Sequence, residues 1–284
     1  MTLLMMLGLC GLLFIAVLTV DGVRARLRRR RQTLARRPMT LVVRHRQTVD
    51  ERLVLLQLAE PHGRTLPMFL AGQHLVLQAP AGPQGRTVQR AYALAAWQAR
   101  PQVYELGIRR EPQGQMSAWV WDHLLPGAHI LLVPPEGHFT VAPELTTLVL
   151  VAGGIGITPL RAMVHQALAA NHSTVLFQAA HHQAGLLYQA EFEALATQHA
   201  HFTYVPVLSR PAPAWHGLTG HLSARRIRAV MPRTTGAHYY LCAPSDMMAM
   251  LRRDLTALGV PASDIHHQSF SADGSTDAVG LHTS

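Results

Sequence analysis

The sequence contains no lysine, only two cysteines and few aromatic residues, which make up 6% of its 284 positions. Cys10 and Cys242 are too few for a framework of disulfide bonds or for a structural zinc site. A plant-type iron–sulfur cluster is held by about four thiolates, so these two cysteines cannot hold one. The 18 histidines occur without carboxylates or thiols at ligand spacing, and we therefore expect no metal site.

Positive charge is concentrated in one short segment of an otherwise balanced sequence. The formal net charge is +9, and eight of the 25 arginines lie between residues 24 and 37. From Met39 onward the other 17 arginines face 15 of the 16 acidic residues. A nucleic-acid-binding body would carry a basic patch or stripe of its own, so we expect no nucleic-acid partner.

Residues 3–20 form an apolar run without a single charge. As a helix the run would be about 27 Å long, close to the roughly 30 Å hydrocarbon core of a bilayer. The arginines follow the run, whereas a cleaved signal carries its positive charge in front, and the positive-inside rule then leaves the N-terminus outside. We expect a transmembrane anchor at 1–22 and an Arg-rich juxtamembrane linker at 23–38. The chain would then cross the inner membrane once, with the lipid bilayer as a partner and the later residues in the cytoplasm; a core helix and a cleaved signal are the alternatives.

Two patterns of hydrophobic periodicity divide the rest of the chain. Residues 39–143 contain short β-branched segments separated by Gly or Pro, with one helical stretch at 116–125, which is typical of an antiparallel β-barrel. Residues 144–270 alternate strand, Gly-rich turn and helix, which predicts an α/β domain with a parallel, Rossmann-like sheet. Residues 271–284 are small and polar, and we expect them to form a disordered tail.

A glycine-rich turn follows the first predicted strand of the second half. Residues 147–159, TLVLVAGGIGITP, run from an apolar strand through glycines to the start of a helix. Glycines let the backbone approach a phosphate, and the first N–H groups of a helix attract anions. The pattern predicts a pyrophosphate site, and a tight β–α turn without a ligand is the alternative. The residues predicted to contact the ligand are Gly153, Gly154, Gly156, Thr158 and Pro159.

Three further motifs accompany this turn. Arg90-Ala91-Tyr92-Ala93-Leu94 lies in a predicted strand, and Gly114-Gln115-Met116-Ser117 opens the helix of the first half. Cys242-Ala243-Pro244-Ser245-Asp246-Met247 joins a strand to a helix in the second half. Each motif alone also fits an ordinary strand, a helix cap or a buried thiol. In this order, however, they resemble the ferredoxin–NADP reductase superfamily of flavoenzymes, and the resemblance covers about residues 39–270.

The resemblance implies an FAD-binding barrel followed by an NAD(P)-binding domain, with hydride transfer from NAD(P)H to FAD between them. In the family the arginine of the first motif pairs with the flavin phosphate and the tyrosine packs on the isoalloxazine ring, roles that fall here on Arg90 and Tyr92. The cysteine of the last motif lies beside the hydride-transfer site, so Tyr92 and Cys242 are the candidate catalytic residues. The other residues implied to bind the cofactors are Ala93, Gly114, Met116, Ser117, Ser209, Arg210, Ala243, Pro244, Met247 and Phe270.

Three positions depart from the pattern of the family. Ala93 stands where a hydroxyl residue usually lies near flavin N5, Ala243 replaces a loop glycine, and Gln268 replaces a common glutamate. These changes raise the alternative of a catalytically quiet flavoprotein that binds and regulates a partner. FAD is expected over FMN from the resemblance alone, and Ser209-Arg210 leaves the choice between NADH and NADPH open.

The electrons are expected to leave to a separate acceptor, because no haem or iron–sulfur segment follows the second half. The expected anchor favours an acceptor at the membrane, such as a ferredoxin or cytochrome serving an oxygenase or desaturase, or a quinone. A reductase that uses diffusible acceptors, such as free flavin, oxygen or ferric complexes, is the alternative.

Overall fold

The computed structural model describes residues 37–142, 144–231 and 236–269. The predicted anchor at 1–22, nearly all of the predicted linker and the tail at 271–284 lie outside these ranges. Within them no helix is both long and apolar enough to cross a membrane, since the longest helices have 13 residues and measure about 20 Å. This finding contradicts the predicted single-pass localisation in the inner membrane, and the described residues do not show the predicted lipid partner.

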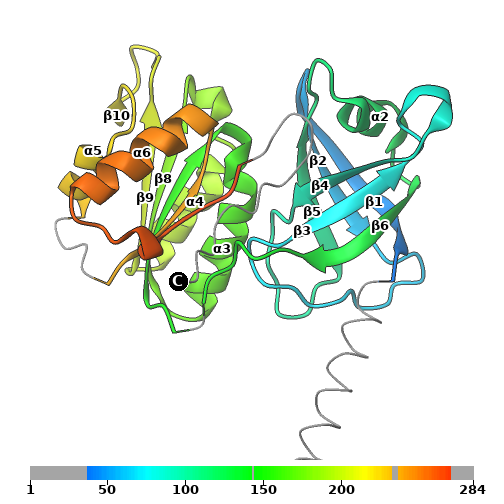
Figure 1. Ribbon diagram of the computed structural model, residues 1–284, viewed down its shortest axis with the longest axis horizontal. Helices are drawn as coiled ribbons and strands as arrows, with labels where there is room; N and C mark the ends of the chain where they lie inside the picture. Colours follow the sequence, from blue (N-terminus) through cyan, green and yellow to red (C-terminus); the bar gives the residue numbers. More distant parts are fainter. Residues whose placement is uncertain (1–36, 143, 232–235, 270–284) are drawn as a thin grey trace, which may run out of the picture. The chain divides into compact units, whose positions relative to one another are not determined.

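The first sheet is six-stranded and has the order β4-β3-β6-β1-β2-β5 (Figure 1). Its strands are β1 (Met39–Asp50), β2 (Leu53–Ala59), β3 (His74–Ala79), β4 (Val88–Ala93), β5 (Val103–Arg109) and β6 (His129–Glu136). Neighbours β1–β2, β2–β5, β3–β4 and β3–β6 pair antiparallel. The two edge strands also meet, because Leu94 forms a bridge with Leu106 and the Ala95 N–H donates to the Glu105 carbonyl at 2.8 Å. This contact joins the edges of the sheet, as the predicted antiparallel barrel requires.

Period-two burial explains why these segments are strands. Along β3, Leu75, Leu77 and Ala79 are buried, while Val76 and Gln78 between them are partly exposed. Alternate side chains of a strand point to opposite faces, so one apolar face lines the core. The helix α2 (Gln115–His123) nearly coincides with the predicted helix at 116–125, and the short 3-10 helix η1 (Pro83–Gly85) lies between β3 and β4.

The second sheet is six-stranded and parallel, with the order β10-β9-β8-β7-β11-β12 (Figure 1). Its strands are β7 (Thr147–Gly153), β8 (Ser173–Ala180), β9 (Phe202–Leu208), β10 (Leu218–Thr219), β11 (His238–Cys242) and β12 (Ile265–His267). The α-helices are α3 (Ile157–Ala169), α4 (Gln189–Gln198), α5 (Ala224–Val230) and α6 (Ser245–Ala257), and the 3-10 helices are η2 (Gly154–Gly156), η3 (Gln183–Gly185) and η4 (Ala262–Asp264). Both sheets belong to one compact unit, Thr40–Ser284.

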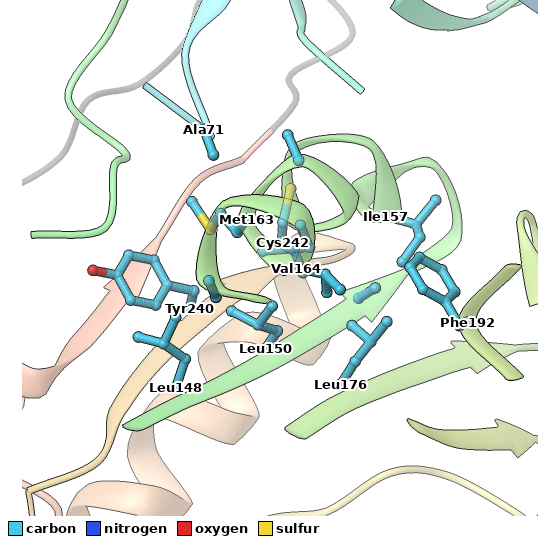
Figure 2. Close-up of a cluster of buried hydrophobic side chains, with 14 of the residues drawn as sticks. Ala71, Leu148, Leu150, Ile157, Met163, Val164, Leu176, Phe192, Tyr240 and Cys242 are labelled. Atoms are coloured by element: carbon cyan, nitrogen blue, oxygen red, sulfur yellow. The ribbon is translucent and has the colours of Figure 1, made fainter. Parts of the chain in front are cut away.

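The central strand β7 is covered on both faces. Leu148, Leu150 and Ala152 pack in the cluster that contains residues of α3 and α4, whereas Val149 and Val151 pack in the cluster of α5 and α6. A parallel strand with helices on both sides carries a continuous apolar run, which is the pattern of residues 147–152. Figure 2 shows Leu148 and Leu150 facing α3, with Met163 and Val164 above them.

The strand order indicates where a ligand is expected to bind on the parallel sheet. From β7 the chain proceeds to β8 and β9 on one side, and it later returns to β11 and β12 on the other. In open α/β sheets ligands bind at the carboxyl ends of the strands where the direction of winding reverses. Here that position lies between the carboxyl ends of β7 and β11, which carry two of the predicted motifs.

Candidate functional site

The glycine-rich turn leads directly from β7 into α3. Gly154 has φ +56°, a left-handed conformation that favours glycine, and a Cβ there would meet no atom within 4 Å. The hydroxyl of Thr158 donates to the carbonyl of Ile155 at 3.0 Å, so this side chain ties the turn together. The first N–H groups of α3, which include that of Thr158 but not of Pro159, have no partner inside the helix and can hold an anion.

The Cys242 loop packs against the glycines of this turn. A Cβ on Gly156 would overlap the carbonyl of Cys242, and one on Gly153 would lie 2.8 Å from Cδ of Pro244 and 2.9 Å from Cβ of Ala243. The structure therefore brings together the two motifs that the sequence places about ninety residues apart. The absence of side chains at Gly153 and Gly156 is what permits the approach.

The thiol of Cys242 is fully buried below this loop. Its exposure is 0%, and burial raises the pKa of the thiol above its usual value, so it is protonated at neutral pH. Such a thiol can pack and shape the floor of the site, but it offers no thiolate. Met247, the third residue of α6, packs against the cluster of α5 and α6, as does Ala243.

Ser209 and Arg210 lie at the carboxyl end of β9, on the same edge of the sheet as the glycine-rich turn. The Ser209 hydroxyl is 2.9 Å from Nδ1 of His181, and the Arg210 N–H donates to the His181 carbonyl at 2.8 Å. Nδ1 of His182 donates to the carbonyl of Arg210 at 2.7 Å. These contacts join the ends of β8 and β9 and leave the Arg210 side chain exposed.

On the barrel, Arg90 and Tyr92 are two residues apart on β4 and therefore project from the same face of the strand. Nη1 of Arg90 donates to the Gln89 carbonyl at 2.7 Å. Burial raises the pKa of the Tyr92 phenol, so it stays protonated and can only donate or accept a hydrogen bond. Ala93 ends the strand, is buried and pairs with His74 in the register of β3.

Ser117 does not form the helix cap that was the alternative to a ligand site at the start of α2. Its hydroxyl accepts from the Glu111 N–H at 3.0 Å and donates to the Gly114 carbonyl at 3.0 Å. A Cβ on Gly114 would overlap this hydroxyl, which explains the glycine. Met116 is buried, and α2 contacts β4, the strand that carries Arg90.

Strand β5 connects the barrel motif to the glycine-rich turn. Leu94 follows Ala93 and bridges to Leu106, and the next residue, Gly107, is so close to α3 that a Cβ there would lie 2.8 Å from Cγ2 of Thr158. The end of β4 and the start of α3 are thus separated by one strand. The sequence contained a signal for this contact, because a glycine inside an apolar strand often marks the close approach of another segment.

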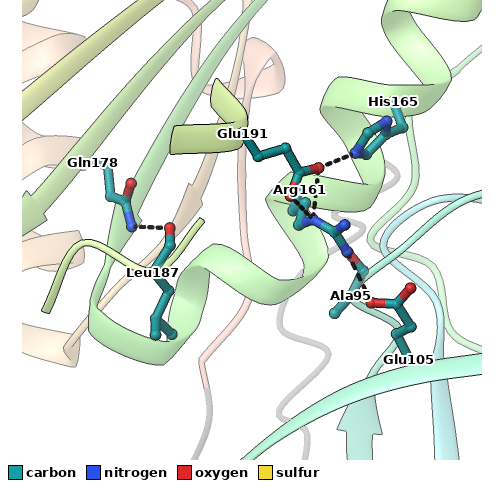
Figure 3. Close-up of polar contacts among 7 residues, drawn as sticks. All are labelled: Ala95, Glu105, Arg161, His165, Gln178, Leu187 and Glu191. Atoms are coloured by element: carbon teal, nitrogen blue, oxygen red, sulfur yellow. Dashed lines mark hydrogen bonds and ion pairs between the residues drawn. The ribbon is translucent and has the colours of Figure 1, made fainter. Parts of the chain in front are cut away.

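Arg161 belongs to none of the predicted motifs, yet its guanidinium group joins three segments (Figure 3). Nε donates to Oε1 and Oε2 of Glu191 on α4 at 2.9 and 2.8 Å. Nη1 donates to the Ala95 carbonyl at 3.0 Å and to Oε2 of Glu105 on β5 at 3.2 Å. Nε2 of His165 lies 2.6 Å from Oε1 of Glu191.

The charges in this network support one another. Burial opposes the positive charge of Arg161, but its bonds to Glu191 and the nearby Glu105 outweigh this effect and raise its pKa. Burial also opposes the negative charge of Glu191, yet the bonds from His165 and Arg161 lower its pKa. The guanidinium group further lies 4.4 Å from the ring centroid of Tyr188. At neutral pH Arg161 is therefore protonated and Glu191 is ionised.

Of two residues singled out near the end of the chain, Gln268 is described by the structure and Phe270 is not. Phe270 lies outside the described residues. Gln268 is buried beside β11, where its N–H donates to the Leu241 carbonyl at 3.0 Å.

Comparisons with known proteins identify both sheets. The family model of the oxidoreductase FAD-binding domain matches residues 38–141, and that of the oxidoreductase NAD-binding domain matches residues 150–253. Ferredoxin–NADP reductase B of Sorangium cellulosum is 32% identical over 244 residues, which cover 78% of this chain and 97% of that protein. A flavohemoprotein of Burkholderia sp. strain TH2 is 27% identical over 238 residues, and the match spans 83% of this chain but only 60% of that protein.

A solved structure agrees with these matches. The crystal structure of an Amycolatopsis cytochrome P450 reductase has a TM-score of 0.72 and 27% identity, over 83% of this chain and 71% of that chain. The FAD-binding and NAD-binding domain models account for the two cofactors, FAD and NAD(P)H. With an antiparallel sheet in the first, a parallel sheet in the second and a near full-length reductase among its relatives, the chain belongs to the ferredoxin–NADP reductase superfamily and is an NAD(P)H-dependent flavin oxidoreductase.

Proposed function

We propose that this chain transfers a hydride from NAD(P)H to FAD and passes the electrons to a separate redox protein. The observation that carries the proposal is the contact of Gly107 with Thr158. Through it the glycine-rich turn lies one strand away from the end of the motif that contains Arg90 and Tyr92. Bound FAD would supply the redox chemistry, since it accepts two electrons together and can release them singly. The protein aligns the two rings and excludes water.

The barrel residues hold the flavin in this proposal. Arg90 is a permanent cation with a planar fork that suits a phosphate, and Tyr92 offers a flat face and a protonated phenol. The first turn of α2, which contains Met116 and Ser117 after Gly114, gives further N–H groups for the phosphate. Residues 39–143 would form this FAD-binding domain.

Residues 144–270 would bind the coenzyme along the carboxyl edge of the parallel sheet. Its pyrophosphate would lie on Gly153, Gly154 and the α3 N-terminus, and its nicotinamide against Ala243 and Pro244. The buried Cys242 would support this loop from below through packing. Ser209 and Arg210 stand where the adenosine end would reach, next to His181.

The acceptor that fits best is a separate iron–sulfur or haem protein. The Sorangium relative is named for a ferredoxin, and the Amycolatopsis relative for a cytochrome P450. The described residues contain one cysteine, the buried Cys242, so a cysteine-held cluster is not formed within them. We therefore propose a ferredoxin or cytochrome as the acceptor, with a quinone as the second candidate.

Anaerobic reduction of the FAD-loaded chain tests the first step. Addition of NADH or NADPH should bleach the flavin absorbance near 450 nm, and the coenzyme that saturates at the lower concentration is the preferred one; the wavelength is a rough property of flavins in general. A flavoprotein that only binds and regulates a partner, which the alanines at 93 and 243 and Gln268 favour, would stay oxidised with both. Reoxidation by a ferredoxin, a cytochrome and a soluble quinone, compared at equal concentration, then identifies the acceptor class.

A further inference from the structure

The Arg161 side chain forms hydrogen bonds with both the barrel and the α/β domain. Nε is committed to Glu191 on α4, within the same domain as Arg161 itself. Nη1 points to the barrel, where it reaches the Ala95 carbonyl just after β4 and Glu105 on β5. The planar guanidinium group fixes the angle between these two directions, which a flexible ammonium group could not do.

Arg161 also lies next to the part of α3 that faces the coenzyme. It follows Thr158 by three residues, so the two side chains are neighbours on one face of the helix. Thr158 contacts the barrel through Gly107, and Arg161 contacts it through Ala95 and Glu105. The first two turns of α3 are therefore held against the edge strands of the barrel at two successive points.

We propose that Arg161 is a positioning residue for hydride transfer, which sets the coenzyme-binding turn relative to the end of β4 through Ala95 and Glu105. This inference rests on the function proposed above. Hydride transfer needs the reacting atoms about 3–3.5 Å apart, and a displacement of about 1 Å can cost roughly a hundredfold in rate. Neither domain can set that distance alone, because the motif around Arg90 and Tyr92 lies on one and the glycine-rich turn lies on the other.

The partly buried ion pairs of Arg161 allow a positioning role of this residue to be distinguished from a purely stabilising one. The Arg161 side chain is 12% exposed, while those of Glu105 and Glu191 are 24% and 27% exposed. Removing one partner of a partly buried ion pair is destabilising, because the other charge stays buried without its partner. A purely stabilising role therefore predicts that each variant lowers the unfolding midpoint, with little change in the rate of flavin reduction at saturating coenzyme in the protein that remains folded.

The test is stopped-flow reduction of the FAD-loaded full chain over a range of NADH and NADPH concentrations. Arg161→Met and Glu105→Met should each lower the limiting rate by about tenfold or more, while the coenzyme Kd changes by less than about twofold. Arg161→Lys should retain part of the limiting rate, because lysine keeps the positive charge but lacks the planar guanidinium group with its fixed N–H directions. The matched control is Arg253→Met, which removes an exposed ion pair with Asp254 on α6 and should leave both constants unchanged.

Two further readouts separate the proposal from a general loss of structure. The double variant Arg161→Met/Glu105→Met should be no slower than Arg161→Met alone, since both single changes remove the same bond. Amide hydrogen exchange of the apoprotein should be faster in β5 and at Ala95 in the Arg161→Met chain, and unchanged in β11. The unfolding midpoints and FAD contents of all variants are measured beside these values, and Arg161→Lys and Glu105→Met carry the test if Arg161→Met does not fold.

The outcomes distinguish this inference from the function on which it rests. If neither coenzyme reduces the wild-type flavin, the proposed function fails and the inference fails with it. If the wild type is reduced but the variants reach the same limiting rate, only the positioning role is overturned. It is also overturned if the variants raise the coenzyme Kd at an unchanged limiting rate, or lose rate only in proportion to lost FAD.

Discussion

Gly156, in the proposed coenzyme site, has no room for a side chain. A Cβ there would overlap the Cys242 carbonyl, so Gly156→Ala must push the glycine-rich turn away from the Cys242 loop. We expect a loss of about 1–3 kcal/mol in the free energy of unfolding and weaker NAD(P)H binding, with FAD binding retained. Urea unfolding and coenzyme titration check this, and Gly185→Ala, at a less crowded turn, is the control. Unchanged coenzyme affinity in Gly156→Ala would contradict the packing described for the two loops.

Glu60 provides a pH-dependent contribution to stability on the barrel. The hydrogen bond from Arg64 lowers the pKa of Glu60 from its ordinary value of 4.5 to about 2. Because the folded pKa is the lower one, the interaction stabilises the folded state fully above the ordinary pKa, and this stabilisation is lost as the pH falls towards about 2. The difference in thermal midpoint between wild type and Glu60→Gln should therefore shrink on acidification. A difference that stays constant from neutral pH to pH 2 would show that the carboxylate is not the cause.

Single residues also show how far the sequence can predict the site. The glycines of the turn and the motifs around Tyr92 and Cys242 are local patterns, and the structure brings the turn and the Cys242 loop together as expected. The role of Arg161 could not be predicted, because Glu105 is 56 residues away and nothing in either local sequence indicates the partner. The hydroxyl of Ser117 gives a further example, since its bonding depends on the path of the preceding turn at Glu111.

At the scale of elements, α4 depends on one aromatic side chain. Phe192 is its buried residue, and the ring contacts those of Tyr188, Phe202 and Tyr204. Phe192→Ala should cost about 3–5 kcal/mol in the free energy of unfolding. It should also increase hydrogen exchange across α4, because Phe192 is the fully buried side chain that joins this helix to the core. Glu193→Ala, an exposed change on the same helix, is the control, and equal stability of the two variants would contradict the anchoring role.

Long elements with an apolar face could be predicted from the sequence, whereas short elements that depend on pairing with a neighbour could not. Helices α3 and α6 have 13 residues each and a clear apolar face, so their positions follow from periodicity. Strand β10 has two residues, both exposed, and carries no pattern; it forms because it pairs with Val207 and Leu208 of β9. Strand β1 runs to Asp50, beyond its apolar part, because pairing with β2 continues along the hairpin.

At the scale of the whole molecule, cofactor binding and folding stability are linked. A ligand that binds only the folded state stabilises it, by about 2.7 kcal/mol at a concentration of 100 Kd. Saturating FAD should therefore raise the unfolding midpoint of the apoprotein, and Arg90→Ala should reduce that rise without lowering the midpoint of the apoprotein itself. Calorimetry with and without FAD measures both, with Arg253→Ala as the control. An equal rise in Arg90→Ala would exclude Arg90 from the flavin site.

The complete burial of Cys242 makes its thiol a built-in reporter of local opening. A reagent that modifies thiols can reach this sulfur only when the buried cluster around it opens, and the turn at Gly156 packs directly against the Cys242 carbonyl. In a Cys10→Ser background its modification rate would thus count such openings directly. Bound NAD(P)H, which would hold the turn and the loop together, should slow the modification, whereas FAD alone should leave it nearly unchanged. The buried sulfur can then report how often the coenzyme site opens, without any measurement of electron transfer.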